Sequence, residues 1–497
     1  MFVCSGKQAR SIDQRASEKY NIPSLDLMEQ AAIECWKQLQ SYKEKKLMVL
    51  CGPGNNGGDG MALARLAIQD GFNVIVSYIG TTMSQSQQVQ YQRLQKMNIP
   101  ILEDMESIHN SIQQAEILID CIFGNGCNRK VRGNYKTIID WMNASNKEII
   151  AIDVPSGLNA DTGKEMGVCV HATQTLALDC FKEGMFIEDG PSVCGKIQCL
   201  DIGIVHEEKD GIIWIDQQLA QTLLPIRSNL SHKGTFGKAL MIGGSQSMPG
   251  ALSMAAKACY SSGIGTLTLM MPDSIADLMM TKIDFAMRII GSDDNGTFGK
   301  ETIPLLKDSI KNYDVISIGN GLGRTQITKQ MVQTVLKSEK PVLLDADAFW
   351  AIQDCPALLN RPAPTIVTPH IKECSMVLGM ESKKVAANPI EAARVFAKKY
   401  PEVVLVLKSH STLVVQGENE YLWSYPNSAL AKGGSGDILC GIICGLFGQR
   451  KDALSSAILG VYLHALSAQT KKDPACAGPD DFLEQLNHLF TKLRKAT

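Results

Sequence analysis

Short aliphatic runs alternate with glycine-rich turns and helix-like stretches along almost the whole chain of 497 residues. Residues 47–51, for example, have the pattern of a buried strand, a glycine-rich turn covers 52–60, and a helix-like stretch follows over 61–67. This alternation is typical of parallel α/β layers, because each parallel strand needs a crossover before the next one. The sequence therefore predicts α/β folds built on parallel sheets.

The glycine clusters divide the chain into two halves, and each half repeats this pattern. At about 150 residues per domain, the length alone allows three domains or two large ones. Residues 205–210 are polar and charged, and 225–232 show little periodicity, so the junction is expected near 210–225. We predict two domains, over residues 1–215 and 216–497.

The charge and cysteine content argue against several classes of protein. Lys and Arg number 49 against 51 Asp and Glu, which gives a net charge of -2 and disfavours a nucleic-acid binder that depends on a basic surface. No segment has the pattern of a signal peptide, and the longest apolar run, 438–447, is too short to span a bilayer. The 15 cysteines include no Cys-x-x-Cys pair, so neither a disulfide framework nor a zinc ribbon fits. We expect a cytoplasmic protein with no nucleic-acid and no membrane partner.

Carboxylates stand at the ends of two predicted strands in the first half. Asp120 follows 117–119, and Asp153 follows 149–152. Ligands of open α/β sheets bind beyond the carboxyl ends of the strands, so both carboxylates are candidates for chemistry. Ser156, three residues after Asp153, adds a hydroxyl, although simple capping of a turn would also explain Asp153 and Ser156.

The glycine-rich turn over 52–60 has the features of an anion site, because it presents unhindered backbone N–H groups at a helix N-terminus. It matches neither a P-loop nor the dinucleotide fingerprint. Asn55, Asn56 and Asp59 can supply oxygens to a hard cation or hydrogen bonds to a polar ligand. A tight turn with an Asx cap would explain the same residues. A second turn, 123–126, is followed by Arg129, Lys130 and Arg132, which can hold phosphates.

Together these motifs resemble the NAD(P)H-hydrate epimerase domain, over about 210 residues, and 27–32 resemble its opening helix. The resemblance implies a Rossmann-like three-layer sandwich with Asp153 as the acid/base group and K⁺ bound by Asn56, Asp120 and Ser156. At Asn125 and Cys127 the sequence departs from the commoner Gly-Thr-Gly-Leu form of the loop. By resemblance, the hydrated nucleotide contacts Asn55, Asn56, Gly57, Gly58, Asp59, Gly124, Asn125, Gly126, Cys127, Asn128, Arg129 and Lys130.

In the second half, residues 433–437 lead directly into a helix predicted from residue 438 onward. The backbone amides there can stabilise a phosphoryl group in transfer, while Asp437 can take a proton from an attacking hydroxyl. A glycine-rich turn capped by Asp would explain the same motif on its own. The segments 368–373 and 408–412 also leave strand ends, and 319–323 is a further glycine-rich turn.

With 232–237 and 243–245, these motifs resemble the ribokinase-like branch that contains the ADP- or ATP-dependent NAD(P)H-hydrate dehydratases, from about Arg227 almost to the end. The resemblance implies a ribokinase-like α/β domain with Asp437 as the base. It also implies that the damaged cofactor contacts Ala251, Gly321, His370 and Glu373. The adenine nucleotide is expected at Lys408, Ser409, His410, Ser411, Thr412, Asn427, Gly433, Gly434, Ser435 and Gly436.

The two resemblances imply one repair function. The enzyme would interconvert the R and S hydrates of NADH and NADPH (NADHX and NADPHX) and dehydrate the S form with Mg²⁺ and ADP, giving AMP and phosphate. We also expect a homo-oligomer. One alternative is a ribokinase-like kinase of a vitamin precursor, which leaves the first half unexplained. Another is a non-catalytic binding module, since the first domain also resembles scaffolds in RNA-processing and lipid-transport proteins.

Overall fold

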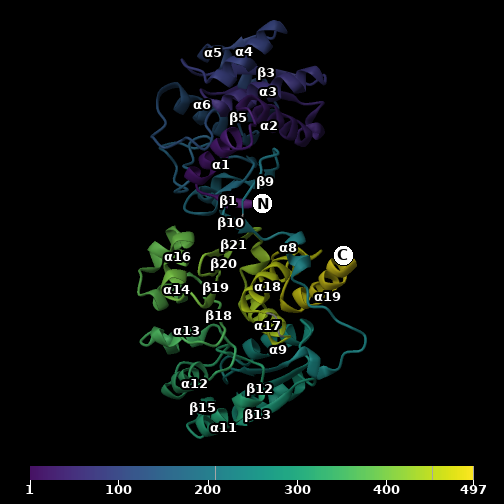
Figure 1. Cartoon of the computed structure of the whole chain (residues 1–497), viewed down its shortest axis with the longest axis vertical. Coiled ribbons are helices and arrows are strands. Elements are labelled where there is room, and N and C mark those ends of the chain that lie inside the picture. The colour runs from purple at the N-terminus through teal and green to yellow at the C-terminus, as the bar shows by residue number, and fades with distance from the viewer. Residues whose placement is uncertain (208, 450–451, 496–497) are drawn as a thin grey trace. The chain divides into compact units, whose positions relative to one another are not determined.

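A computed structural model describes residues 1–207, 209–449 and 452–495. It divides the chain into two compact units, Met1–Ile213 and Trp214–Thr497 (Figure 1). No helix among the described residues has the length and apolar character that crossing a membrane requires.

The N-terminal unit is built on a parallel sheet of seven strands in the order β4-β3-β2-β5-β6-β7-β9. The order reverses between β2 and β5, which places a crevice at their carboxyl ends. The strands are β2 (Lys46–Cys51), β3 (Asn73–Tyr78), β4 (Ile101–Leu102), β5 (Ile117–Cys121), β6 (Glu148–Ile152), β7 (Gln174–Leu178) and β9 (Lys196–Leu200).

Helices cover both faces of this sheet. Leu47 and Val49 of β2 pack in one apolar cluster with α1, α2 and α3, whereas Met48 and Leu50 pack in a second cluster with α5 and α6. Successive side chains of a strand point to opposite faces, so the two clusters are the two sides of a three-layer sandwich, as predicted. The helices are α1 (Gly6–Glu18), α2 (Ser24–Gln38), α3 (Asn55–Gln69), α4 (Gln85–Lys96), α5 (Met105–Gln114), α6 (Gly133–Ala144) and α7 (Gly190–Val193).

Three short strands complete this part of the chain. β1 (Phe2–Cys4) pairs in parallel with β8 (Phe181–Lys182) and antiparallel with β10 (Ile212–Trp214). The pairing ties the segment that follows β7 to the chain start, so Lys182 lies beside Cys4.

The C-terminal unit repeats the doubly wound plan. Its sheet runs β13-β12-β11-β16-β17-β18-β19-β20-β21, parallel up to β19 and antiparallel from there. The order again reverses, here between β11 and β16. The strands are β11 (Lys238–Ile242), β12 (Thr266–Pro272), β13 (Met287–Gly291), β16 (Val315–Ile318), β17 (Val342–Leu344), β18 (Thr365–Val367), β19 (Val403–Leu407), β20 (Ser411–Gln416) and β21 (Asn419–Ser424), with a separate hairpin of β14 (Asp293–Asp294) and β15 (Thr297–Phe298).

One helix of this unit, α17 (Ser435–Gly448), is buried along almost its whole length and packs with α9 and α18 in the main apolar cluster (Figure 1). A helix that is apolar all round belongs in a core. The other helices are α8 (Gln217–Thr222), α9 (Pro249–Ser261), α10 (Ala276–Lys282), α11 (Thr302–Ser309), α12 (Gln326–Leu336), α13 (Asp347–Ile352), α14 (Ile371–Leu378), α15 (Ser382–Ala387), α16 (Pro389–Lys399), α18 (Ala453–Ser467) and α19 (Pro479–Lys495).

The predicted strands are confirmed, but two helices begin earlier than predicted. The turn predicted over 52–60 ends at Gly54, and α3 already begins at Asn55. Gly54 has φ +91°, a conformation that glycine adopts without strain, so the chain can turn sharply there and enter the helix at once. Likewise α17 begins at Ser435 and not at 438. Both asparagines and Asp437 therefore lie in first helical turns.

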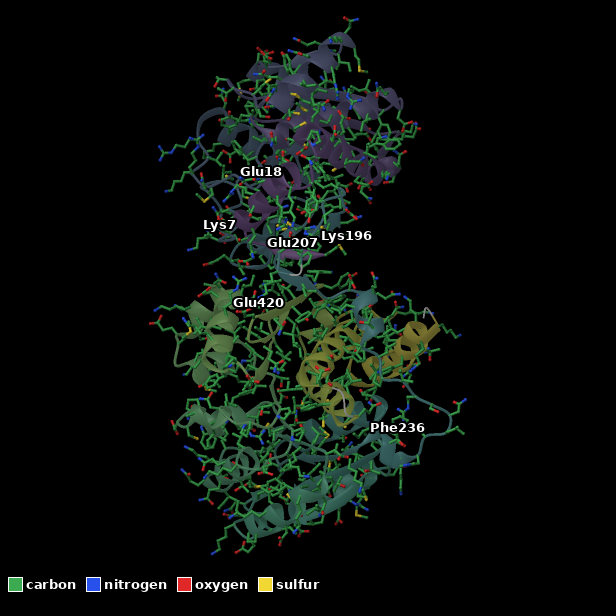
Figure 2. The ribbon with its side chains drawn as sticks, in the orientation of Figure 1. Lys7, Glu18, Lys196, Glu207, Phe236 and Glu420 are labelled. Atoms are coloured by element: carbon green, nitrogen blue, oxygen red, sulfur yellow. The ribbon has the colours of Figure 1, made fainter. Side chains whose placement is uncertain are left out.

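The aperiodic segment 225–232 follows α8 and is held at its start by a stacked pair. The guanidinium of Arg227 lies 3.7 Å from the ring centroid of Phe236, which Figure 2 labels. A guanidinium over an aromatic face is attracted by the ring quadrupole.

Candidate active sites

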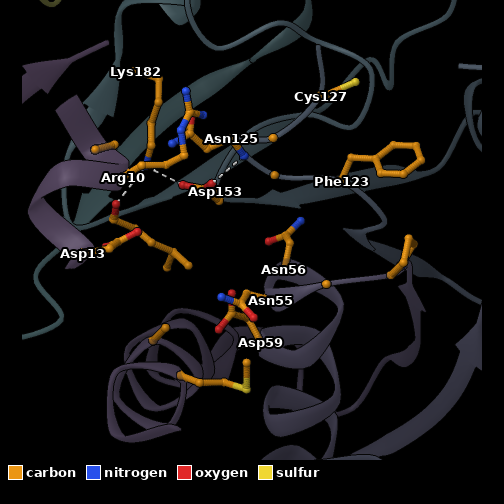
Figure 3. A pocket seen from close by; sticks show the side chains of 18 of the residues that line it. Arg10, Asp13, Asn55, Asn56, Asp59, Phe123, Asn125, Cys127, Asp153 and Lys182 are labelled. Carbon is orange, nitrogen blue, oxygen red and sulfur yellow. Dashed lines mark hydrogen bonds and ion pairs between the residues drawn. The ribbon is translucent and has the colours of Figure 1, made fainter. Parts of the chain in front are cut away.

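A cavity of about 700 Å³ lies at the carboxyl end of the N-terminal sheet, beside the β2/β5 crossing point. Its walls come from α1, α2, the start of α3, the loop after β5, and the ends of β6 and β7 (Figure 3). Most of the predicted epimerase residues line it. These are Asn55, Asn56, Asp59, Gly124, Asn125, Gly126, Cys127, Arg129, Lys130 and Asp153.

Asp153 is held from two sides in this cavity. Its Oδ2 accepts a hydrogen bond of 3.1 Å from the backbone N–H of Asn125, and its Oδ1 accepts one from Lys182 Nζ (Figure 3). Asp153 also has φ +68°, which costs energy for a residue with a side chain and is frequent at functional sites. The backbone thus turns this carboxylate into the cavity.

Lys182 is a buried cation without access to bulk water, its side chain being 4% exposed. Besides Asp153, its Nζ donates to the carbonyl oxygens of Leu178 and Cys180, each at 2.9 Å. Burial by itself would lower the pKa of Lys182, but the neighbouring Asp153 carboxylate raises it, so the ammonium stays charged.

Behind the cavity wall, Asp120 and Ser156 form a second polar cluster. Asp120 is fully buried and accepts from the Ser156 N–H at 2.7 Å, from Ser156 Oγ at 2.5 Å and from the Ile122 N–H at 3.2 Å. Burial raises the pKa of Asp120 to about 6, and the bonds from Ser156 oppose that shift.

Asn56 is buried, and neither atom of its amide has a hydrogen-bond partner in the described part of the chain. Buried polar atoms are normally paired, so an orphaned amide aimed at a cavity marks a ligand position. Asn56 and Asp120 supply an amide oxygen and a carboxylate, which are donors suited to a hard cation. The set predicted for K⁺ therefore fits such an ion chemically.

Two further carboxyl groups face the same cavity. Asp13 of α1 is open to the cavity, and the surrounding walls raise its pKa to about 6, chiefly by desolvation and further by Asp153. Burial raises the pKa of Asp59 well above its ordinary value. The site thus contains Asp153, which is bound by Lys182, and two further carboxyl groups. Asp13 and Asp59 keep their protons to a higher pH than an ordinary aspartate does.

Other predicted residues support the cavity or lie at its rim. Gly57 and Gly58 are absent from its lining. A side chain on Gly57 would strike the carbonyl oxygen of Gly52, and one on Gly58 would strike Met28. Asn128 does not line it either, whereas Arg10 and Arg132 do.

In the C-terminal unit, the predicted motif 433–437 places Asp437 in the first turn of α17. Asp437 Oδ1 accepts a hydrogen bond of 2.7 Å from Asn320 Nδ2, and Asn320 lies two residues beyond the end of β16. Burial raises the pKa of Asp437 to about 6, and the charge of Asp345 adds to the shift. The backbone N–H groups of the first turn and the helix dipole point to the same position.

Lys408 lies close to this motif. Its Nζ binds Asp345 Oδ1 at 3.0 Å, and a side chain added at Gly436 would come within 3.4 Å of it. Burial tends to lower the pKa of Lys408, but Asp345 and Glu373 raise it overall. A cation is therefore available where a phosphoryl group would lie.

His370 and Glu373 form the N-terminal cap of α14. His370 Nδ1 accepts from the backbone N–H groups of Lys372 and Glu373, and Glu373 Oε2 accepts from that of His370. Burial raises the pKa of Glu373 to about 7, while Lys408 opposes the shift. The backbones of His370 and Lys408 form a β-bridge, so the two predicted segments are brought together.

The remaining predicted residues fall into two groups. Gly321 and Ala251 lie face to face, since a side chain on Gly321 would come within 3.1 Å of the Ala251 Cβ. Asn427 caps the turn that precedes α17 and also donates to the Ala468 carbonyl. The Ser409 hydroxyl donates to the carbonyl oxygen of Ser411, and His410 lies between these two residues. Strand β20 begins with Ser411 and Thr412.

Several functional candidates were not predicted. Asp345 and Asn320 follow strands β17 and β16, so the strand-end rule that selected Asp120 and Asp153 could have found them. His464 of α18 lies under the start of α17, with its Nε2 2.9 Å from the Ser435 carbonyl oxygen. Lys182 carries no such signal, because it lies in the short strand β8, four residues beyond the end of β7.

Comparison with known proteins decides the family. The model of the NAD(P)H-hydrate dehydratase family matches residues 239–486, and that of the YjeF-related protein N-terminus matches 24–184. The bifunctional NAD(P)H-hydrate repair enzyme of Moorella thermoacetica is 30% identical over 518 residues, covering 100% of this chain and 98% of the relative. The chain belongs to the family of bifunctional NAD(P)H-hydrate repair enzymes.

Other members agree with this assignment. The Vibrio cholerae repair enzyme is 32% identical, covering 93% of this chain and 92% of its own. Among solved structures, the ADP/ATP-dependent NAD(P)H-hydrate dehydratase of Bacillus subtilis, co-crystallised with ATP and Mg²⁺, is 27% identical, with a TM-score of 0.50 over 57% of this chain and 99% of that one. The chain is therefore a repair enzyme with an epimerase domain and a ribokinase-like dehydratase domain, and neither a vitamin-precursor kinase nor a scaffold.

Proposed function

We propose that the N-terminal cavity is the epimerase site, with Asp153 as its proton-transfer group, and that Asp437 is the base of the dehydratase site. The observation that carries the proposal is the same in both halves. A carboxylate that accepts a hydrogen bond from an amide N–H lies near the carboxyl ends of the strands of a doubly wound sheet. The substrates are NADHX and NADPHX, and the domains correspond to residues 1–215 and 216–497.

Epimerisation requires the C6 hydroxyl to leave as water and to return on the other face of the ring. The C6 hydroxyl must be protonated before it leaves, because hydroxide is a poor leaving group. As the C–O bond breaks, the lone pair of the ring nitrogen stabilises the electron-poor C6. Asp13 or Asp59 keeps its proton to a higher pH and supplies it. On return, the attacking water gives its proton to Asp153, which accepts a hydrogen bond from Lys182, and passage of this proton back to the donor carboxylate closes the cycle.

Dehydration begins with phosphoryl transfer. The C6 hydroxyl oxygen attacks the terminal phosphorus of ADP, its proton passes to Asp437, and the bond from phosphorus to the bridging oxygen breaks to release AMP. Phosphate then leaves C6 with the electron pair of the C–O bond, and transfer of the C5 proton to the departing phosphate restores the ring double bond. The N–H groups of Ser435 and Gly436 and the Lys408 ammonium stabilise the charge in transfer.

Mg²⁺, when bound with the nucleotide, neutralises phosphate charge. The ATP and Mg²⁺ of the Bacillus subtilis dehydratase crystal support the same pairing here.

K⁺ is our choice for the cluster of Asn56, Asp120 and Ser156, because the unpaired amide of Asn56 needs a partner. Exchange of K⁺ for tetramethylammonium should slow epimer exchange while leaving dehydration of pure S hydrate unchanged. An unchanged rate of epimer exchange would refute the assignment.

A nucleotide-dependent repair assay tests the whole proposal. Pure protein, mixed NADHX epimers, Mg²⁺ and either ADP or ATP are combined, and the absorbance of reduced nicotinamide is followed. Complete recovery with ADP is expected, because both epimers are consumed. No recovery with either nucleotide would overturn the dehydratase assignment, and recovery that stops at the S fraction would overturn the epimerase assignment.

Cellular location and assembly extend the proposal. All 15 cysteines are free thiols, which supports a reducing cytoplasm. We expect a homo-oligomer, which sedimentation of the pure protein measures directly.

A further inference from the structure

Four strand ends and one helix start meet at the proposed base of the dehydratase site. Asn320, Asp345 and Thr368 each follow a strand of the parallel part of the sheet, and each is at most 2% exposed. Lys408 follows the next strand, and Asp437 comes from α17. Carboxyl ends of neighbouring parallel strands lie at one edge of the sheet, so these polar side chains meet in a buried network.

The amide of Asn320 is fixed in one orientation. Its Nδ2 donates one hydrogen to Asp437 Oδ1 at 2.7 Å and the other to Asp345 Oδ2 at 2.9 Å. Its Oδ1 faces the Cys440 thiol, with the sulfur at 3.2 Å. Burial raises the pKa of Cys440 well above its ordinary value, so the thiol keeps its proton and acts as donor. If the Asn320 amide were flipped, its oxygen would face the oxygens of two carboxylates, and neither side could donate a hydrogen bond.

Both carboxylate oxygens of Asp345 are occupied by hydrogen bonds from neighbouring side chains. Its Oδ2 accepts from Asn320, while its Oδ1 accepts from Thr368 Oγ1 at 2.7 Å and from Lys408 Nζ at 3.0 Å. The buried charge of Asp345 is thus balanced by the ammonium of Lys408. Asp437 differs, because only its Oδ1 is engaged, and its Oδ2 makes no hydrogen bond within the described ranges.

We propose that Asn320 is the positioning residue of the dehydratase. It occupies one oxygen of Asp437 and turns the other toward the reacting hydroxyl, while its second hydrogen anchors it to Asp345. The proposal rests on the assignment of Asp437 as the base. Asn320 itself touches neither the substrate proton nor the transferred phosphoryl group, so its loss lowers kcat and leaves the binding of both ligands in place.

Asn320→Asp provides the test, because it keeps the size of the side chain and removes both donated hydrogens. In the full-length protein, with S-NADHX and ADP, we expect kcat to fall about 100-fold while both KM values stay within about twofold. The groups that set the charge around Asp437 are Asp345, Asp347 and Lys408. The carboxylate that Asn320→Asp adds to these groups should make Asp437 harder to ionise. The acid limb of the kcat/KM profile should therefore move to higher pH by about one unit.

Two controls separate the possible failures. Asn312→Asp makes the same chemical change on the surface and should leave kcat, KM and the pH profile unaltered. Thermal unfolding of each variant, followed by circular dichroism, reports whether the C-terminal unit that carries the substitution is folded. Loss of activity in Asp437→Asn together with wild-type kcat and pH profile in Asn320→Asp would overturn the positioning role alone. Full activity in Asp437→Asn would overturn the assignment of the base, and the positioning role with it.

Discussion

In the proposed mechanism, Asp153 and Asp437 divide the two activities between two single residues. Because general acid–base groups contribute about 10²–10⁴ in rate, Asp153→Asn should slow epimer exchange at least about 100-fold. Dehydration of pure S hydrate should stay unchanged, because Asp153 belongs to the N-terminal unit. Chiral chromatography of the hydrates over time measures the exchange, and a loss of both activities in a folded protein would contradict this division.

The pair of Lys182 and Asp153 also contributes to stability. Lys182→Met removes the cation and leaves a carboxylate that is 13% exposed without its main partner. Breaking one side of a buried ion pair costs about 3–5 kcal/mol, which urea unfolding of the variant measures. The double variant Lys182→Met/Asp153→Asn should recover much of this loss, because no charge is left unpaired. A double variant as unstable as the single one would show that the lysine acts through its backbone contacts instead.

The pH dependence of dehydration follows from Asp437. The base must be ionised, so kcat/KM should be halved near pH 6, where its raised pKa lies, and should fall about tenfold per unit below that. An ordinary aspartate would place this limb near pH 4. Glu373, with a pKa of about 7, could produce a similar limb, so the profile should be repeated in Glu373→Gln. A limb that disappears in that variant would assign the titration to Glu373.

At the level of strands and turns, Gly319 makes the contact between β16 and β17 possible. It has φ +133°, and an added Cβ would lie 1.7 Å from the Asp345 carbonyl oxygen. Gly319→Ala should therefore destabilise the C-terminal unit by about 1–3 kcal/mol and reduce dehydration, because the Asn320 and Asp345 side chains are pushed apart. Thermal unfolding with a dehydratase assay measures both effects.

Gly478→Ala is the matched control, since open space surrounds that position and its φ is ordinary. It should change the midpoint of unfolding little. Equal losses in the two variants would mean that backbone entropy, and not the contact with Asp345, explains the effect.

Strand positions were predictable because they depend on local pattern, whereas the partners of the site residues depend on the order of the strands. Asp120, Asp153 and Asp437 could be identified from runs of apolar residues and glycine turns. The bond from Asn320 to Asp437 joins residues 117 positions apart, and that from Lys182 to Asp153 joins residues 29 positions apart that follow different strands. Helix starts were placed late because asparagine and glycine are turn formers, yet they suit a first turn whose N–H groups need no helical partner.

For the whole molecule, two self-contained units imply that the hydrates can be exchanged through solution. Equal amounts of Asp153→Asn and Asp437→Asn proteins, each inactive in complete repair, should together convert a mixture of both epimers fully to NADH. The first supplies dehydration and the second supplies epimer exchange. Recovery that stops at the S fraction would show that the two activities must reside in one chain.

The three hydrogen bonds that hold Asn320 also bear on how the enzyme ages. Asn320 precedes Gly321, and an Asn-Gly pair loses its amide when the glycine nitrogen attacks the side-chain carbonyl carbon, a reaction that makes asparagine thermolabile. Deamidation here would produce the same aspartate that abolishes the donor to Asp437. Because the amide is bound to Asp345, Asp437 and Cys440, its carbon is kept from the approach that this attack requires. On this proposal, the contacts that orient the base would also extend the working life of a protein whose task is to reverse the spontaneous decay of another molecule.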